Sequence, residues 1–224
     1  MRLNTFAEAQ EVQAENPDVV IIATGGLPDI DWISGAEHCT TSWDFLTGAA
    51  PTKESILVYD GTGRNPAMSC AERAAVAGAQ VSLVALDGSF GPEMTYSEQV
   101  TWKQRLYDLD IPASFDLLLK SVQESGDKLQ VTFANEVTGK QVTKTVDQVV
   151  IERGTLPADD LYQELRAASA NDGVTDIECL LAGKAQPGSE TSNAAFQLHR
   201  IGDAVSSRNI YSAILDAARL SNSI

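Results

Sequence analysis

Short apolar runs mark the principal strands that this sequence predicts. Four of these runs, at residues 18–22, 56–59, 81–86 and 147–152, are continuous rather than alternating. Continuous runs of this length are typical of strands buried on both faces, as in a parallel sheet covered by other layers. The pattern therefore predicts an α/β fold.

The best-defined unit covers residues 55–87. A strand at 56–59 is followed at once by Gly61 and Gly63, then by a helix over 68–77 that Gly78 ends, and then by the strand at 81–86. Glycines in such a turn let the backbone come close to a phosphate, and Asp87 stands where a dinucleotide-binding fold places its ribose-binding acid. The segment predicts a Rossmann-like βαβ unit.

The glycine fingerprint of this unit departs from G-x-G-x-x-G. Pro66 stands at the third glycine position and has no backbone N–H, and Asp60 brings a negative charge to the turn. Two interpretations stay open, an NAD(P)-binding turn and a turn that is only structural.

The pattern changes between residues 115 and 151. Runs at 117–122, 128–134 and 141–146 are β-rich and are separated by turn residues, which predicts an antiparallel meander. Two stretches, 47–55 and 153–157, are expected to carry the chain between domains.

Helices are expected around these strands. Thr5-x-x-Glu8 and Thr95-x-x-Glu98 are capping boxes that predict helices over 5–15 and 95–109, and a shorter helix is expected over 161–168. The polar stretch 182–195 predicts a long, mobile loop.

The end of the chain predicts a ligand site. A strand at 197–201 delivers Gly202 and Asp203 to a helix that starts near Asn209 and Ile210 and ends near residue 220. A carboxylate there would bind hydroxyl groups beside the anion-binding end of a helix, although it could also simply cap the turn. The small residues Ala23, Thr24 and Gly25, after the first strand, leave room for a flat ligand or for another backbone segment.

Composition excludes several classes of function. The 224 residues carry 16 Lys and Arg against 31 Asp and Glu, a net charge of −15, which disfavours nucleic acid and anionic membrane surfaces as partners. Three cysteines without a C-x-x-C pair allow neither a metal quartet nor a redox dithiol, and a reduced, cytoplasmic setting is expected. No Tyr-x-x-x-Lys pair of a short-chain reductase is present.

Four motifs together resemble a known family: ATGG at 23–26, DGTG at 60–63, ERGTLP at 152–157 and RIGDAVSSRNIYSAILDA at 200–217. They are similar to the C-terminal third of the NADH:flavin oxidoreductases related to trimethylamine and dimethylamine dehydrogenases and N-methylproline demethylases. The resemblance implies two Rossmann-like subdomains of the FAD/NAD(P)-binding type. Residues 1–48 and 150–224 would form an incomplete FAD- or ADP-type subdomain, and residues 52–146 an inserted NAD(P)-type subdomain that carries the meander.

By this resemblance the Ala23 to Gly25 turn would lie near the flavin-side nucleotide, and Asp203 would bind ribityl or ribose hydroxyls. FAD or ADP and NAD(H) are the implied cofactors, whereas FMN and a 4Fe–4S cluster would belong to an N-terminal barrel. That barrel, and the family's first nucleotide-binding strand, should precede Arg2, so the sequence is expected to be a fragment without catalytic residues. The missing barrel is an expected partner, and a homo-oligomer is possible. The alternative is a stand-alone module that binds a nucleotide weakly or binds another protein.

Overall fold

The computed structural model describes residues 1–187 and 196–224, and it divides the chain into two compact units. Unit 1 contains Met1–Leu27 and Thr155–Ile224, and unit 2 contains Pro28–Gly154. Strands β2 (Gly26–Pro28) and β11 (Thr155–Pro157) pair with each other where the chain passes between the units.

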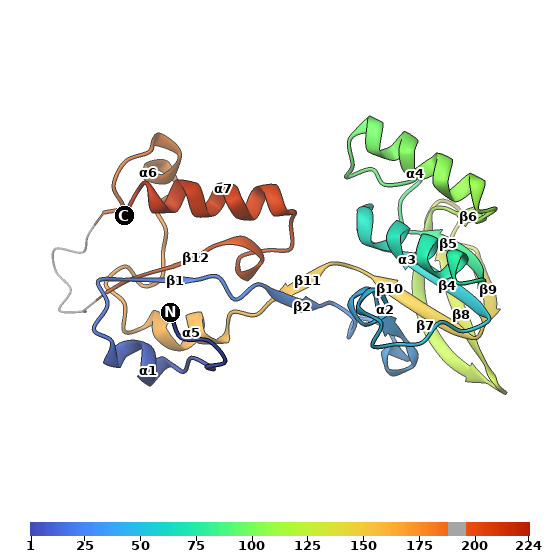
Figure 1. Cartoon of the computed structure of the whole chain (residues 1–224), viewed down its shortest axis with the longest axis horizontal. Coiled ribbons are helices and arrows are strands. Elements are labelled where there is room, and N and C mark those ends of the chain that lie inside the picture. Colours follow the sequence, from blue (N-terminus) through green and yellow to red (C-terminus); the bar gives the residue numbers. More distant parts are fainter. Residues whose placement is uncertain (188–195) are drawn as a thin grey trace. The chain divides into compact units, whose positions relative to one another are not determined.

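Unit 2 is built on a five-stranded parallel sheet (Figure 1). Its strands, in spatial order, are β3 (Thr40–Thr41), β10 (Gln148–Glu152), β4 (Ser55–Asp60), β5 (Gln80–Ala85) and β6 (Ala113–Ser114). The central β4 is buried along its length because successive side chains point to opposite faces of the sheet and both faces are covered. This is why its apolar run is continuous.

Helices cover one face of the unit 2 sheet and the meander covers the other. Ile56 and Val58 pack in a cluster with side chains of α2 (Ser42–Thr47), α3 (Asn65–Val76) and α4 (Tyr96–Asp108). Leu57 and Tyr59 pack in a second cluster with β7 (Leu117–Ser125), β8 (Lys128–Asn135) and β9 (Gln141–Val146), the antiparallel meander. The expected α/β class with parallel strands and a meander is confirmed.

Unit 1 is built around two parallel strands, β1 (Val19–Ile22) and β12 (Gln197–Arg200). Its helices are α1 (Ala9–Ala14), α5 (Asp160–Arg166), α6 (Ile177–Ala182) and α7 (Ile210–Ser221). Apolar residues of β1, β12 and α5 form the core of this unit. Two short 3₁₀ helices complete the structure, η1 (Ala36–His38) in unit 2 and η2 (Gly202–Ala204) in unit 1.

The structure differs from the sequence-based expectation at several elements. Helix α1 begins at Ala9 rather than near residue 5, because its capping box is formed by Glu8 and Glu11, while the Thr5 hydroxyl donates to the Leu3 carbonyl. Helix α6 and the short strands β2, β3, β6 and β11 were not expected. Of the loop predicted at 182–195, residues 188–195 lie outside the described residues.

Residues 28–48 and 150–154 form part of unit 2, although the sequence motifs place them in the first subdomain. They pack in unit 2 because β10 pairs with β3 and β4, and because α2 contacts α3. The assignment of one nucleotide type to each subdomain stays a prediction.

Candidate functional site

The first candidate site lies in unit 1, where β1 and β12 end. The two strands run in parallel with Ile22 opposite Arg200, and the Ile201 N–H donates to the Ile22 carbonyl at 3.0 Å. Because the carboxyl ends of parallel strands meet at one edge, the pairing brings the 23–25 turn next to Gly202 and Asp203. The sequence motifs from opposite ends of the chain thus share one edge.

Asp203 is held in place by two donors at this edge. Its Oδ1 accepts the backbone N–H of Arg208 at 3.2 Å, and its Oδ2 accepts the Thr155 hydroxyl at 3.3 Å. Gly202 has φ +63°, and its N–H donates to Asp216 Oδ2 of α7 at 3.1 Å. An ionised carboxylate accepts about four hydrogen bonds, so the half-buried Asp203 retains capacity for hydroxyl groups.

The turn after β1 is open next to Gly25. The Thr24 hydroxyl donates to the Ala158 carbonyl at 2.6 Å, and the Ala158 N–H donates to the Gly25 carbonyl at 3.0 Å. Gly25 has φ +74°, and no described atom lies within 4 Å of the place a Cβ would take. Ala23 is exposed. The turn therefore fits a ligand that approaches its backbone.

Asn209 and Ile210 lie at the start of α7, where Asn209 caps the helix and Ile210 is exposed to solvent. The Asn209 side chain caps the helix, with Oδ1 accepting the Ser212 N–H at 2.9 Å. Ile210 is 80% exposed. Ile214, one turn further along the helix, is also exposed.

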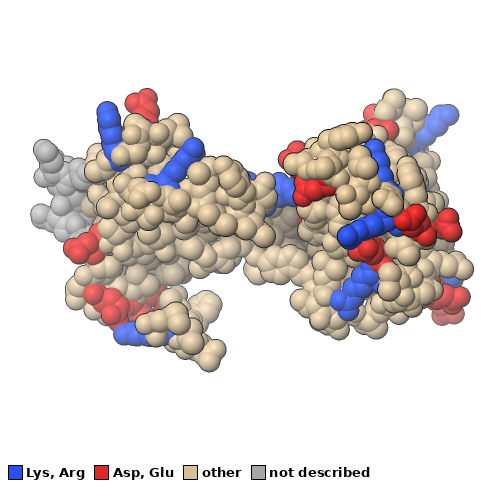
Figure 2. Space-filling view, turned by 45° about the horizontal axis from the view of Figure 1, so that its top comes forward, with Lys and Arg blue, Asp and Glu red and all other residues tan. Residues whose placement is uncertain are grey.

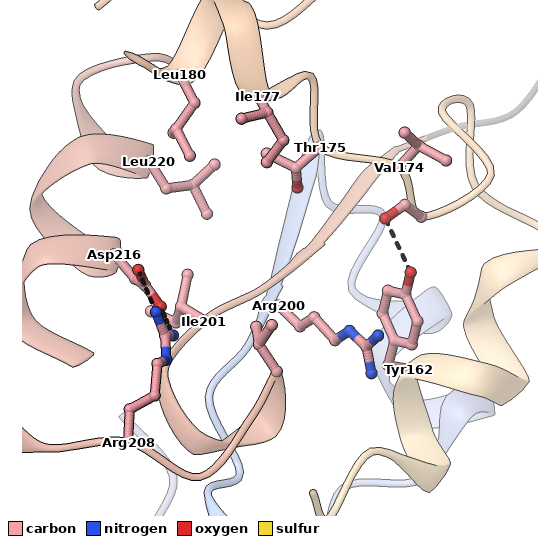
Figure 3. Close-up of a pocket in the computed structure, with 12 residues that line it drawn as sticks. Tyr162, Val174, Thr175, Ile177, Leu180, Arg200, Ile201, Arg208, Asp216 and Leu220 are labelled. Atoms are coloured by element: carbon pink, nitrogen blue, oxygen red, sulfur yellow. Dashed lines mark hydrogen bonds and ion pairs between the residues drawn. The ribbon is translucent and has the colours of Figure 1, made fainter. Parts of the chain in front are cut away.

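A cavity of about 380 Å³ lies in unit 1 beside this edge (Figure 3). Apolar side chains of α6 and α7, including Leu180 and Leu220, line part of it. Arg208 forms an ion pair with Asp216 on one side, and Arg200 lies over the Tyr162 ring at 4.5 Å on another. Both arginines therefore have carboxylate or aromatic partners within the protein.

The second candidate site lies in unit 2, after β4. Gly63 has φ +63°, and a Cβ there would lie 2.6 Å from Pro92 and 3.0 Å from Asp87 Oδ2. A Cβ at Gly61 would lie 3.2 Å from the Glu152 carbonyl oxygen. Gly63 and Asp87 lie close together, but protein atoms occupy the space next to both glycines.

Asp60 holds the backbone donors of the same turn. Its side chain is fully buried, and its Oδ1 accepts the N–H groups of Thr62 at 3.1 Å and Gly63 at 2.8 Å. Burial, with Asp87 and Glu152 nearby, raises the pKa of Asp60 to about 6. Burial and the charge of Glu93 also raise the pKa of Asp87. With Asp60 ionised, this turn does not fit a pyrophosphate.

Several residues of the two sites were not foreseen. Thr155 and Arg208 hold Asp203, and Pro92 covers Gly63, yet no spacing rule links these residues to their partners in sequence. For the second site, the sequence did give one signal, the negative charge that Asp60 brings to the glycine turn.

The described residues contain no group of three or more His, Cys, Asp or Glu that could hold a metal ion. In the same residues, no helix is long and apolar enough to cross a membrane. Basic side chains on the face drawn in Figure 2 are scattered and lie beside acidic ones.

Comparison with known proteins shows which proteins this chain is related to. No family model matches the chain. It is 43% identical over 222 residues to the multifunctional alkene reductase/demethylase OYE of Caballeronia cordobensis, which covers 98% of this chain and 33% of that protein. It is 41% identical over 218 residues to the probable N-methylproline demethylase of Rhizobium meliloti, which covers 97% of this chain and 32% of that protein. The chain is homologous to the C-terminal third of these enzymes. The resemblance seen in the sequence motifs is thereby confirmed.

Solved structures agree on the fold. Histamine dehydrogenase from Rhizobium superposes with a TM-score of 0.76 at 21% identity, over 98% of this chain and 31% of that one. Thioredoxin reductase from T. acidophilum superposes with a TM-score of 0.61 at 18% identity, over 92% of this chain and 64% of that one. The fold is that of the Rossmann-like domains of thioredoxin reductase-like proteins. The chain spans about a third of the length of its curated relatives.

Proposed function

We propose that this chain is the nucleotide-binding, electron-transfer portion of a flavin-dependent NADH:flavin oxidoreductase that acts on N-methylated amines. The observation that carries the proposal is the 43% and 41% identity, over nearly the whole chain, to proteins named as demethylases. In this proposal the chain supplies no catalytic residue. FMN and the 4Fe–4S cluster belong to a barrel domain that is its partner, in the cytoplasm.

Unit 1 takes FAD or ADP in this proposal. Asp203 accepts hydrogen bonds from ribityl or ribose hydroxyls, since its two present donors leave acceptor capacity. The open turn of Ala23, Thr24 and Gly25, with Gly202, lets the nucleotide approach the backbone. Asn209 fixes the start of α7 next to Asp203, and Ile210 flanks the ligand. Bound FAD supplies electron transfer; the residues of this chain bind and orient it.

Unit 2 takes NAD(H) in this proposal. Asp87 could accept a hydrogen bond from a ribose 2′-hydroxyl and would repel a 2′-phosphate, so NAD(H) is favoured over NADP(H). The ionised Asp60 and the packing of Pro92 on Gly63 oppose a pyrophosphate. We therefore assign weak NAD(H) binding to Gly61 and Gly63.

The test is a calorimetric titration of the chain with ADP at pH 7.5. Asp203→Asn should weaken ADP binding about tenfold or more, because a hydrogen bond to a charged group contributes about 1.5–3 kcal/mol. Asp18→Asn is the matched control, since Asp18 is exposed and precedes β1 at the opposite edge. Equal affinity of the two variants would refute the role of Asp203.

One observation favours the alternative of a protein-interaction module. Ile210, Tyr211 and Ile214 of α7 are 80%, 72% and 63% exposed, which is unusual for large apolar side chains on one helix. Failure of ADP to bind the unaltered chain at all would favour this alternative.

A further inference from the structure

The carboxylate of Asp60 occupies the place where the turn after β4 would hold an anion. In a strand–turn–helix unit, the backbone N–H groups of the turn and the start of the helix point at a bound phosphate. Here the N–H groups of Thr62 and Gly63 donate to Asp60 Oδ1 instead. Pro66, in the first turn of α3, contributes no N–H. The protein thus fills its own anion position with a side chain.

The second oxygen of this carboxylate is left without a partner. Among the residues that the structure describes, Asp60 Oδ2 is buried and accepts no hydrogen bond. An unpaired buried charge is costly, and a buried carboxyl group is instead favoured in its neutral form. These surroundings therefore favour the protonated, neutral form of Asp60 over the ionised form.

The charged neighbours of Asp60 do not compensate its charge. Asp87 follows β5, and Glu152 ends β10, where its oxygens accept the Ser42 hydroxyl and the Gly154 N–H. Arg153 lies over the Trp32 ring at 4.1 Å and 3.8 Å from a carboxylate oxygen of Asp29.

Two more charged residues belong to the loops at this edge. Arg64 precedes α3. Glu93 belongs to the loop between β5 and α4, and its backbone N–H donates to the Gly63 carbonyl at 3.2 Å. Burial, and after it the charges of Asp87 and Glu152, raises the pKa of Asp60 to about 6.

We propose that Asp60 is a proton-operated gate of the unit 2 site: a dinucleotide pyrophosphate binds at Gly61 and Gly63 only when Asp60 carries a proton. This inference rests on the proposed NAD(H)-type role of unit 2 and adds its regulation. A protonated Asp60 has no charge to repel the phosphates, and its oxygen competes less strongly for the Thr62 and Gly63 donors. Uptake of one proton thus accompanies ligand binding above pH 6.

The gate predicts a measurable pH dependence. If only the neutral form binds, the apparent affinity follows the neutral fraction of Asp60, which changes about fifty-fold between pH 8 and pH 6 for a pKa of about 6. NAD⁺ is a suitable probe because its pyrophosphate diester keeps its charge over this range. The affinity of the unaltered chain should rise by up to that factor as the pH falls.

The experiment titrates NAD⁺ into the full chain by calorimetry at pH 6, 7 and 8. All titrations use the Asp203→Asn background, which weakens binding in unit 1 and so reduces its contribution. Asp60→Asn keeps the Oδ1 acceptor and removes the charge. It should bind NAD⁺ at least tenfold more tightly than its parent at pH 8, with no pH dependence. Asp110→Asn is the matched control, because exposed Asp110 precedes β6 at the opposite edge of the sheet; it should behave as the parent does.

A second measurement follows the proton itself rather than the affinity. Titrations at pH 7.5 in two buffers of different ionisation enthalpy should report uptake of about one proton per NAD⁺ bound, and Asp60→Asn should abolish this uptake. Affinity that is independent of pH, or an Asp60→Asn variant that binds no better than Asp110→Asn, would overturn the proposal. If ADP binding still depends on Asp203, that outcome leaves the proposed function intact; if no nucleotide binds any form, both fail.

Discussion

At the scale of single residues, Asp60 affects stability as well as binding. Its folded pKa of about 6 lies above its ordinary value of 3.8, so between these two pH values the folded state binds more protons than the unfolded state. Stability therefore falls as the pH rises through this window, and the full penalty is present above pH 6. A shift of about two units corresponds to at most about 3 kcal/mol.

Asp60→Asn should therefore stabilise the protein at pH 7.5, by about 1–3 kcal/mol, since the charge that opposes folding is removed. The gain should shrink towards zero by pH 4, where wild-type Asp60 is itself largely neutral. Urea denaturation at both pH values measures it, with Asp110→Asn as the control for loss of a surface charge. A variant less stable than wild type at pH 7.5 would show that the ionised carboxylate supports the turn.

At the scale of elements, the two capping boxes show how far local sequence signals extend. The box expected at Thr95 is present, with Glu98 accepting both the N–H and the hydroxyl of Thr95, at 3.0 and 2.7 Å. The box expected at Thr5 is displaced by three residues, to Glu8 and Glu11. Helix α4 buries Leu106 fully and packs the partly buried Trp102 on the core, and the cap adds to this packing.

Thr95→Ala should cost about 1 kcal/mol of stability, because it removes the side chain of the cap. Thr101→Ala is the control on the same helix: Thr101 is exposed in the helix interior, where alanine is the better helix former, so its effect should be neutral or slightly stabilising. Urea denaturation of both variants at pH 7.5 compares them. Equal destabilisation by the two changes would contradict a capping role.

At the scale of the whole molecule, the contacts that we propose for nucleotides are few. Unit 1 offers Asp203 and the 23–25 turn, and unit 2 offers a glycine turn whose donors Asp60 already holds. Both units belong to a chain with a net charge of −15, which opposes the binding of any phosphate-bearing ligand.

The purified chain should therefore retain no flavin. An absorption spectrum recorded after gel filtration should lack the visible band of oxidised flavin, because so few contacts cannot keep the cofactor through dilution. Added FAD removed by the same column would be consistent with this expectation. A flavin band that survives the column would show that unit 1 binds the cofactor far more completely than its described contacts indicate.

The sequence by itself determined the order and type of the main elements. The run at 56–59, the glycines that follow and the alternation in 128–134 act through short-range backbone preferences and burial periodicity, so they could be interpreted locally. The Gly202-Asp203 pair and the Ala23 to Gly25 turn were identified for the same reason. Short segments such as β3 and α6 carry too few residues for such a signal.

Only the tertiary structure decided what these residues touch. Pairing of β1 with β12 joins the two ends of the chain, Thr155 reaches Asp203, and Pro92 fills the space at Gly63. The burial that raises the pKa of Asp60 likewise depends on the complete packing of unit 2. Contacts between residues that are distant in sequence form when the whole core packs cooperatively and lowers the free energy of the folded state. No local pattern encodes these contacts.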